Sequence, residues 1–164
     1  MRRKIPSVES RDPQVAAHHS RVSAIAVAIV GTMGLSTGDQ QCLRVAALCH
    51  DIGAVHIRPQ ILLKPGSLTA GEWMIVHSHP EISFETLSRV EFPWPIGDII
   101  LQHPGRLDGS GYAHHLMRED IRIEARILAV ADVIDAMSAP VSHRPVSGHD
   151  AAIREVRKKP RNSL

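Results

Sequence analysis

The sequence has few of the features that mark secreted or membrane proteins. It holds 2 Cys, 2 Trp, 2 Phe and 1 Tyr among 164 residues. Cys42 and Cys49 are seven residues apart in a helical pattern, which favours two thiols in the core over a disulfide. The longest apolar run, 24–30, is far shorter than the roughly 20 residues of a membrane-spanning helix. The polar, proline-containing start does not resemble a signal peptide, so we expect a cytoplasmic protein without a membrane segment.

The sequence also lacks a strong excess of either charge. The formal net charge is +2, and Lys and Arg are scattered until the last dozen residues, so DNA is not an expected partner. Hydrophobic residues make up 43% and charged residues 22%, as in an ordinary globular domain. We predict an N-terminal tail over 1–11, one domain over 12–150, and a basic C-terminal tail over 151–164.

No segment shows the alternation of apolar and polar residues that marks a β-strand, so we predict an all-α protein built as a compact helical bundle. The first helix is expected to begin at Asp12-Pro13 and to end at Gly31 and Gly34. Asp39 is the expected N-cap of the second helix, and Gly53 is expected to end that helix. Later helices are predicted from a capping box at 69–72, from Pro80, over 96–101 and over 123–137, with loops or extended chain at 57–65 and 104–112.

Histidine is the residue in surplus, with 11 in the chain. Some of these histidines lie in or beside predicted helices and next to apolar residues. Two aspartates lie in the same kind of position. Helices that converge on a buried polar centre would place such side chains together, and His with Asp is a ligand set that Zn, Mn and Fe accept. The candidate positions are His18, His50-Asp51, His79, His103 and Asp132. The other histidines that we considered are expected on the surface or in loops: His56, His77, His114, His115, His143 and His149.

His50 and Asp51 are adjacent, so on an ideal helix their side chains point about 100° apart. Both reach one site only at a helix end, or when Asp51 bridges two ions. Two ions roughly 3.5–4 Å apart could activate a shared water and hold the nonbridging oxygens of a phosphate. The dipeptide alone occurs by chance in many proteins. Here it follows an apolar stretch, 47–49, and no exposed face of the helix explains it.

These motifs, in this order, resemble the HD-GYP family, a branch of the HD phosphohydrolases, over about 12–150. His50-Asp51-Ile52-Gly53 resembles the HD motif, and Leu63-Lys64-Pro65-Gly66 resembles the loop that follows it. His79-Pro80-Glu81 resembles the next histidine motif. Residues 108–112, which read Asp-Gly-Ser-Gly-Tyr, resemble the loop that names the family, and residues 129–133 resemble its last metal-ligand helix.

The resemblance implies an all-α bundle of the HD-domain type around a buried metal centre, which hydrolyses cyclic di-GMP to pGpG or GMP. We therefore expect one or two divalent ions, Fe or Mn with Zn also open. It implies His18, His50, Asp51, His79, His103 and Asp132 as metal ligands, with Asp51 bridging. Asp51 and Lys64 are the catalytic candidates. Candidate substrate contacts are Lys64, Asp108, Gly109, Gly111, Tyr112 and Arg144. Expected partners are a cyclic dinucleotide and, beyond it, receiver, sensor or diguanylate cyclase domains.

The sequence departs from the family pattern at several positions. Ala54 stands where the family has a lysine, and Pro104 stands where it has a second histidine. A proline ring has no ligand atom, so one metal position should be weakened; His114 or His115 is the alternative source of a ligand. Gln14 is a further departure, which argues against a third ion. Ala113 is another. Val141 and His143 also depart from the pattern and leave Arg144 as the only remnant of an arginine motif. Family members usually continue with more helices, so a truncated chain is one expectation.

Two hypotheses therefore stay open. The first is a metal-dependent phosphodiesterase that uses a metal-activated water. The second is a catalytically degenerate binding or regulatory module in cyclic dinucleotide signalling, which would explain Ala54 and Pro104. A nucleotide hydrolase of another HD type is a third alternative, which the 108–112 loop disfavours.

Overall fold

The computed structural model describes residues 13–62, 64–104, 120–138 and 154, and these residues form helices and connections without a strand. The all-α prediction is confirmed. The elements are α1 Pro13–Thr32, α2 Thr37–Cys49, the 3-10 helix η2 Ile52–His56, α3 Pro59–Leu62, α4 Ala70–His77, α5 His79–Leu87, α6 Ile96–Gln102 and α7 Ile123–Ser138. Within these described ranges no helix combines the length and apolarity needed to cross a membrane.

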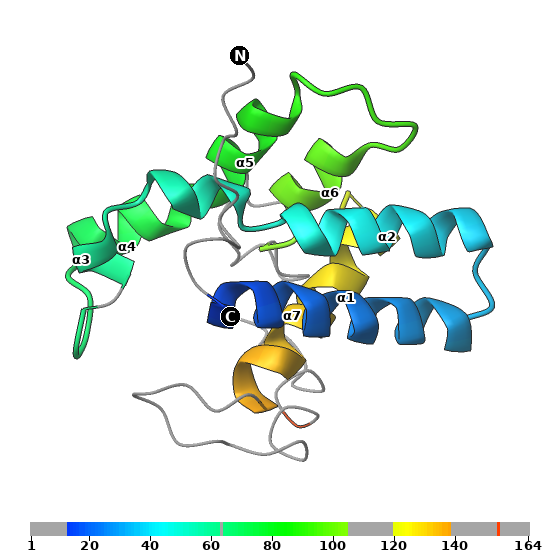
Figure 1. Ribbon diagram of the computed structural model, residues 1–164, viewed down its shortest axis with the longest axis horizontal. Coiled ribbons are helices and arrows are strands. Elements are labelled where there is room, and N and C mark those ends of the chain that lie inside the picture. The colour runs from blue at the N-terminus through cyan, green and yellow to red at the C-terminus, as the bar shows by residue number, and fades with distance from the viewer. Residues whose placement is uncertain (1–12, 63, 105–119, 139–153, 155–164) are drawn as a thin grey trace, which may run out of the picture.

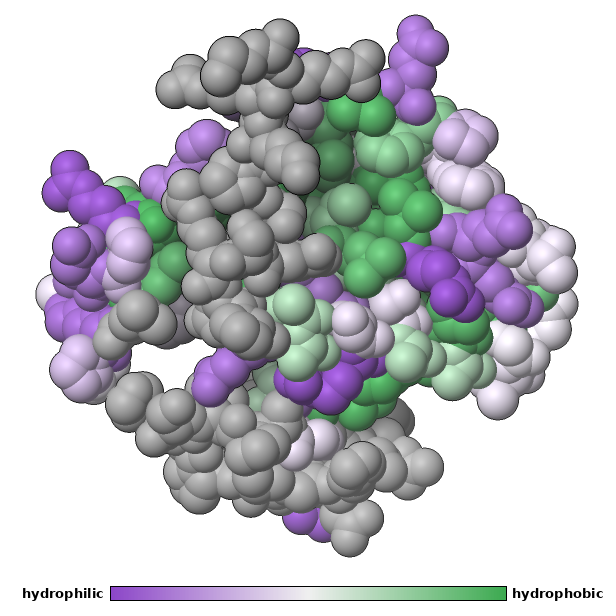
Figure 2. All heavy atoms as spheres, viewed as in Figure 1, coloured by the Kyte–Doolittle hydropathy of each residue, from purple (hydrophilic) through white to green (hydrophobic). Residues whose placement is uncertain are grey.

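Helices α1 and α2 form an antiparallel pair, and α7 and α6 pack against it (Figure 1). Helix α5 packs on η2 and α6, while α3 and α4 lie at one side of the molecule (Figure 1). Apolar residues fill the space between α1, α2, α6 and α7. The fully buried members include Val22, Ala26, Val30, Leu43, Ala46, Ile99, Ile100, Leu128 and Ala131. On the face drawn in Figure 2, apolar residues gather near α6 and the α5–α6 connection, where Phe92 and Trp94 pack on the core.

Cys42 and Cys49 do not form a disulfide, as predicted. Cys42 lies in the core, and burial raises the pKa of its thiol to about 11. A thiol with so high a pKa stays protonated at neutral pH and behaves as a small apolar side chain.

The start of α2 corrects one prediction. Asp39 was expected to be the N-cap, but the N-cap is Ser36, three residues earlier. The Asp39 N–H donates to Ser36 Oγ (3.1 Å), and the Ser36 N–H donates to Asp39 Oδ2 (2.9 Å). This reciprocal pair is a capping box, in which the acidic residue occupies the third helical position. The same arrangement at Thr69 and Glu72 was predicted, and it opens α4.

The segment 57–65 differs in part from the expected loop, because α3 forms one helical turn over Pro59–Leu62. A proline at its first position is compatible with helix, and the turn is too short to show helical periodicity in the sequence. Gly53 also differs from its expected role. Helix α2 ends at Cys49, and Gly53 lies inside η2.

Gly53 allows the chain after His50-Asp51 to approach α5 closely. A Cβ atom at Gly53 would lie 2.2 Å from the backbone oxygen of His79 and 2.7 Å from the backbone nitrogen of Ser83. The Gly53 N–H donates to Ser83 Oγ (2.8 Å), and that hydroxyl donates to the His50 carbonyl (3.0 Å). Ser83 is fully buried. These contacts fix the His50-Asp51 turn against the helix that carries His79.

We predict that Gly53→Ala lowers the free energy of unfolding by at least about 2 kcal/mol, because the new methyl group meets backbone that cannot rotate away. Chemical denaturation measures the effect. Gly31→Ala is the matched control, since nothing lies within 4 Å of its added Cβ in α1. The control should be neutral or stabilising by up to about 1 kcal/mol. Equal effects of both substitutions would contradict the close approach at Gly53.

Candidate metal centre

Five parts of the fold bring the six predicted metal ligands into one region. His18 comes from α1, His50 and Asp51 from the end of α2, and Asp132 from α7. His79 opens α5, and His103 follows the last residue of α6. His50 is the C-cap of α2, and Asp51 has left the helix with φ −99° and ψ 14°. The helix end therefore allows adjacent side chains to reach the same site, one of the two routes expected from the sequence.

The Asp51 carboxylate lies at the middle of this region, with a different set of imidazoles at each oxygen. Oδ2 lies 3.3 Å from His50 Nε2 and 3.8 Å from His18 Nε2. Oδ1 lies 3.4 Å from His79 Nε2. A carboxylate flanked on both oxygens has the geometry needed to bridge two cations.

Asp132 adds a second carboxylate on the Oδ2 side. Its Oδ1 lies 3.4 Å from His18 Nε2 and 3.9 Å from His50 Nε2. Two donor atoms that each sit about 2.1 Å from one ion are separated by about 3.0 to 4.2 Å, depending on the angle between them. The ligand atoms of His18, His50 and Asp51 also lie within 4.8 Å of one another. The spacing of His18, His50 and Asp51 therefore suits one shared ion.

Three of the histidines are oriented by carbonyl groups at helix ends. Nδ1 lies 2.8 Å from the Ala47 oxygen in His50, 2.7 Å from the Val76 oxygen in His79 and 2.6 Å from the Ile100 oxygen in His103. Carbonyl oxygens only accept, so Nδ1 is a donor in all three rings, and in the neutral form of each ring the lone pair is on Nε2. These carbonyls belong to last helical turns, which lack partners within the helix. The three helix ends thus select the tautomer that a metal ligand needs.

His18 is oriented by a carboxylate instead. Its Nδ1 lies 2.8 Å from Asp135 Oδ2, and Asp135 is 3% exposed. Arg21 donates from Nε to Oδ1 (2.6 Å) and from Nη2 to Oδ2 (3.0 Å) of the same carboxylate. Burial alone would raise the pKa of Asp135, but the bonds from Arg21 and His18 lower it below its ordinary value. Arg21 and Asp135 were not among the predicted site residues, although each lies one helical turn from a predicted ligand.

The charges in the centre keep its groups in different protonation states. Burial and the charge of His50 lower the pKa of His103 to about 3, so His103 is neutral at ordinary pH. Burial would also lower the pKa of His50, but Asp51 and Asp132 raise it to about 9. His50 in turn helps to hold the pKa of Asp51 well below its usual range, against the effect of burial. Burial and the nearby Asp51 charge raise the pKa of Asp132.

The donors fit a divalent cation. His50 is 1% exposed, and among the described residues its Nε2 has no hydrogen-bond partner. An unsatisfied buried nitrogen is costly in a folded protein, and a bound cation would use its lone pair. Imidazole and carboxylate are ligands that Zn, Mn and Fe accept alike, so this set does not select among those metals.

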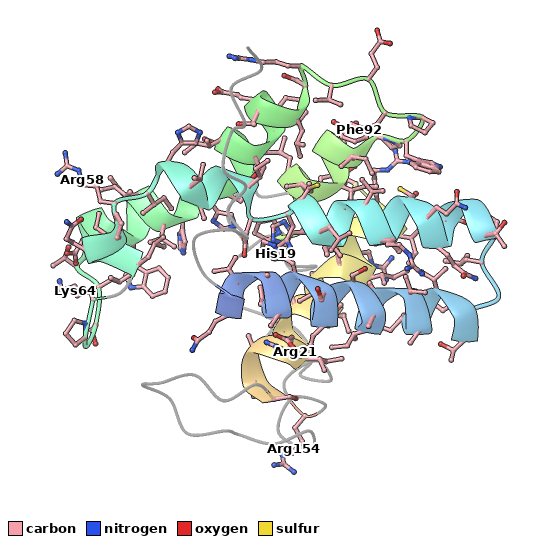
Figure 3. The ribbon with its side chains drawn as sticks, in the orientation of Figure 1. His19, Arg21, Arg58, Lys64, Phe92 and Arg154 are labelled. Atoms are coloured by element: carbon pink, nitrogen blue, oxygen red, sulfur yellow. The ribbon has the colours of Figure 1, made fainter. Side chains whose placement is uncertain are left out.

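Lys64 lies apart from this centre. Its Nζ donates to Glu72 Oε2 (2.6 Å) and Oε1 (2.9 Å). This bond lowers the pKa of Glu72 to about 2. In Figure 3, Lys64 lies at the α3–α4 side of the molecule, well away from His19 at the centre. The structure thus pairs Lys64 with a carboxylate and does not bring it among the six ligand candidates.

Some of the remaining predicted residues lie within the described part of the chain and others lie outside it. Ala54 lies within η2, and Pro104 directly follows His103. Neither side chain adds a ligand atom, because one is a methyl group and the other a proline ring. The candidates that fall outside the described residues are Asp108, Gly109, Gly111, Tyr112, His114, His115 and Arg144. One further histidine was missed. His19, next to His18 on α1, is 2% exposed and lies beside Asp51.

The sequence profile of the HD domain family matches residues 4–163. The chain is 38% identical over 149 residues to the cyclic di-GMP phosphodiesterase response regulator RpfG of Xanthomonas campestris, and 40% identical over 153 residues to a cyclic di-GMP phosphodiesterase of Thermotoga maritima. It is 36% identical over 140 residues to the 3'3'-cGAMP-specific phosphodiesterase 2 of Vibrio cholerae. The matches cover 90%, 90% and 84% of this chain but 39%, 41% and 27% of those proteins.

Two solved structures share the fold. Bd1817, an HDG"Y"P protein from Bdellovibrio bacteriovorus, superposes with a TM-score of 0.68 at 19% identity, over 92% of this chain and 54% of that one. The HD domain of the phosphodiesterase PgpH from L. monocytogenes superposes with a TM-score of 0.66 at 21% identity, over 92% of this chain and 80% of that one. At these identities the likeness concerns the fold.

We predict that Asp135→Asn weakens divalent metal binding by about 10- to 100-fold, because the neutral amide no longer fixes the His18 tautomer as a carboxylate does. Calorimetric titration with Mn(II) measures the change. Asp98→Asn is the matched control, since Asp98 is exposed on α6, and its affinity should equal that of the unchanged protein. Unchanged affinity in Asp135→Asn would show that His18 does not depend on this carboxylate.

Proposed function

The chain belongs to the HD domain family, and on that premise we propose that it is a metal-dependent phosphodiesterase that hydrolyses cyclic di-GMP to pGpG or GMP. The observation that carries the proposal is the Asp51 carboxylate, with Nε2 of His18 and His50 near one oxygen and Nε2 of His79 near the other. The names of the curated relatives support the substrate class, since they are phosphodiesterases of cyclic di-GMP or 3'3'-cGAMP.

We propose that the centre holds one or two divalent ions, Fe or Mn with Zn as an alternative. His18, His50 and Asp132 would hold an ion on the Oδ2 side of Asp51, and His79 and His103 would hold an ion on the Oδ1 side. Such ions supply activation of a water molecule at neutral pH and stabilisation of negative charge on phosphoryl oxygens. The fixed Nδ1 bonds of His50, His79 and His103 orient the donors before an ion or substrate arrives.

The two sides of Asp51 differ in the number of donors. On the Oδ2 side, His18 and His50 are joined by Asp132 (3.4 and 3.9 Å). On the Oδ1 side, His79 Nε2 lies 3.4 Å from Asp51 Oδ1, and the centre of the His103 ring lies 6.0 Å from that of His79 and 5.5 Å from that of His50. Pro104 offers no further ligand there. We therefore expect the ion on the Oδ1 side to be the weaker one.

A catalytically degenerate binding module is the second candidate. It is favoured by Ala54 and Pro104, whose side chains carry no ligand atom. Such a module would keep the fold and bind a cyclic dinucleotide without cleaving it. Metal content and turnover separate the two proposals.

Other parts of the proposal concern residues and partners. Lys64, Asp108, Gly109, Gly111, Tyr112 and Arg144 remain the proposed substrate contacts. For Lys64, contact with substrate would require the bond to Glu72 to open. We also propose a cytoplasmic location and association with receiver, sensor or diguanylate cyclase domains.

We predict hydrolysis of cyclic di-GMP by purified protein loaded in turn with Fe(II), Mn(II) or Zn(II), followed by chromatography of the products. Asp51→Asn keeps the shape of the side chain but removes the bridging charge, so the rate should fall by about 100-fold or more. His56→Ala is the matched control, because His56 is exposed at the end of η2, and its rate should be unchanged.

A parallel reaction with 3'3'-cGAMP tests which cyclic dinucleotide is preferred. If no metal supports turnover while the folded protein binds cyclic di-GMP, the degenerate module is correct. If Asp51→Asn keeps the full rate, the proposed centre is not the site of hydrolysis.

A further inference from the structure

His19 is a buried histidine whose ring nitrogens form no hydrogen bond within the described part of the chain. Its side chain is 3% exposed, and both Nδ1 and Nε2 are buried without a hydrogen-bond partner among the described residues. The other histidines that border Asp51 differ from it, because each has its Nδ1 bonded to a carbonyl or to Asp135. In Figure 3, His19 lies between the ribbons of α1 and α2. His19 is therefore placed without the contacts that orient its neighbours.

Adjacent side chains on a helix point about 100° apart, yet Nε2 of His19 approaches the same carboxylate oxygen as Nε2 of His18 and His50. Its Nε2 lies 3.8 Å from Asp51 Oδ2, the same distance as His18 Nε2. The His19 ring centre lies 5.1 Å from that of His50 and 5.6 Å from that of His18. A separation of 3.8 Å is too long for a hydrogen bond but falls within the range for two donors on one ion.

A purely structural role does not explain this arrangement. An imidazole that is buried with both nitrogens unsatisfied costs free energy that an apolar side chain of similar size would not cost. His19 lies three residues before Val22 and seven before Ala26, both fully buried, so its position on α1 is a core position that suits an apolar residue. A bound cation would satisfy one nitrogen and offset this cost.

We propose that His19 is a ligand of the ion on the Oδ2 side of Asp51, beside His18 and His50. This inference rests on the metal centre of the proposed function and extends it, since the six sequence-derived ligands do not include His19. The Oδ2 side would then hold three imidazoles and two carboxylates. Its ion should bind in the tighter of two steps, whereas the ion beside His79 should bind in the weaker one.

The test is a titration of the metal-free protein with Co(II), followed by calorimetry and by visible absorption, which reports the ligands of the ion. His19→Gln removes the imidazole and keeps a polar side chain. Its tighter binding step should weaken by at least about 10-fold, and the spectrum of the first equivalent should change. The weaker step should keep its affinity, and His56→Ala should match the unchanged protein in both readouts.

A second variant separates a ligand from a packing residue. His19→Leu replaces the unsatisfied ring with an apolar side chain, so the metal-free variant should melt at the same temperature as the metal-free parent or higher. The rise in melting temperature on adding Co(II) should be smaller in the variant than in the parent. A variant that melts much lower without metal but binds Co(II) as the parent does would show that His19 is a packing residue, and would overturn the inference.

The outcomes also separate this inference from the proposed function. If the unchanged protein takes up no Co(II), the metal centre itself fails, and the inference fails with it. If the unchanged protein binds Co(II) and His19→Gln binds it with equal affinity and an identical spectrum, only the assignment of His19 is wrong.

Discussion

The structure depends on the electrostatic arrangement around Asp51, whose carboxylate is surrounded by imidazoles from α1, the end of α2 and the start of α5. Burying so many polar groups is unfavourable unless they satisfy one another or bind an ion. Contacts with the surrounding helices hold these side chains in place. Carbonyls at three helix ends hold Nδ1 of the histidines, and Asp135 with Arg21 holds His18. Gly53 and Ser83 hold the turn that carries Asp51.

The same arrangement explains why the centre is uneven. The Oδ2 side of Asp51 faces His18, His19 and His50, and Asp132 lies near His18 and His50. The Oδ1 side faces His79, and the centre of the His103 ring lies 5.5 Å from that of His50 and 6.0 Å from that of His79. Pro104 adds no donor to the weaker side. An HD domain with this distribution of donors would keep one ion firmly and a second one loosely, so activity would depend on the supply of metal. This dependence of activity on the metal supply would distinguish an enzyme from an inactive module.

Helical periodicity was sufficient to predict the all-α fold, and the resemblance of several motifs in order was sufficient to predict membership of the HD family. The pattern of His and Asp residues predicted six side chains that the fold brings into one region, Asp51 among them. Two features were missed because they depend on three-dimensional contacts. The bond between Asp135 and His18 joins residues 117 positions apart, and the approach of Gly53 to His79 and Ser83 depends on how η2 packs on α5. His19 could have been found, because it continues the buried stripe of Val22 and Ala26. The Asp39 cap was wrong by one helical turn, since an acidic residue suits both the N-cap and the third helical position.

The central claim is that the side chains around Asp51 form a divalent metal centre that this carboxylate bridges. The most direct measurement is a crystal structure of the protein soaked in Mn(II), with anomalous scattering recorded to locate the ions. We predict a strong peak between Asp51 Oδ2, His18 and His50, and a weaker peak between Asp51 Oδ1 and His79. Anomalous density confined to sites away from Asp51, in crystals that take up Mn(II) elsewhere, would contradict the claim.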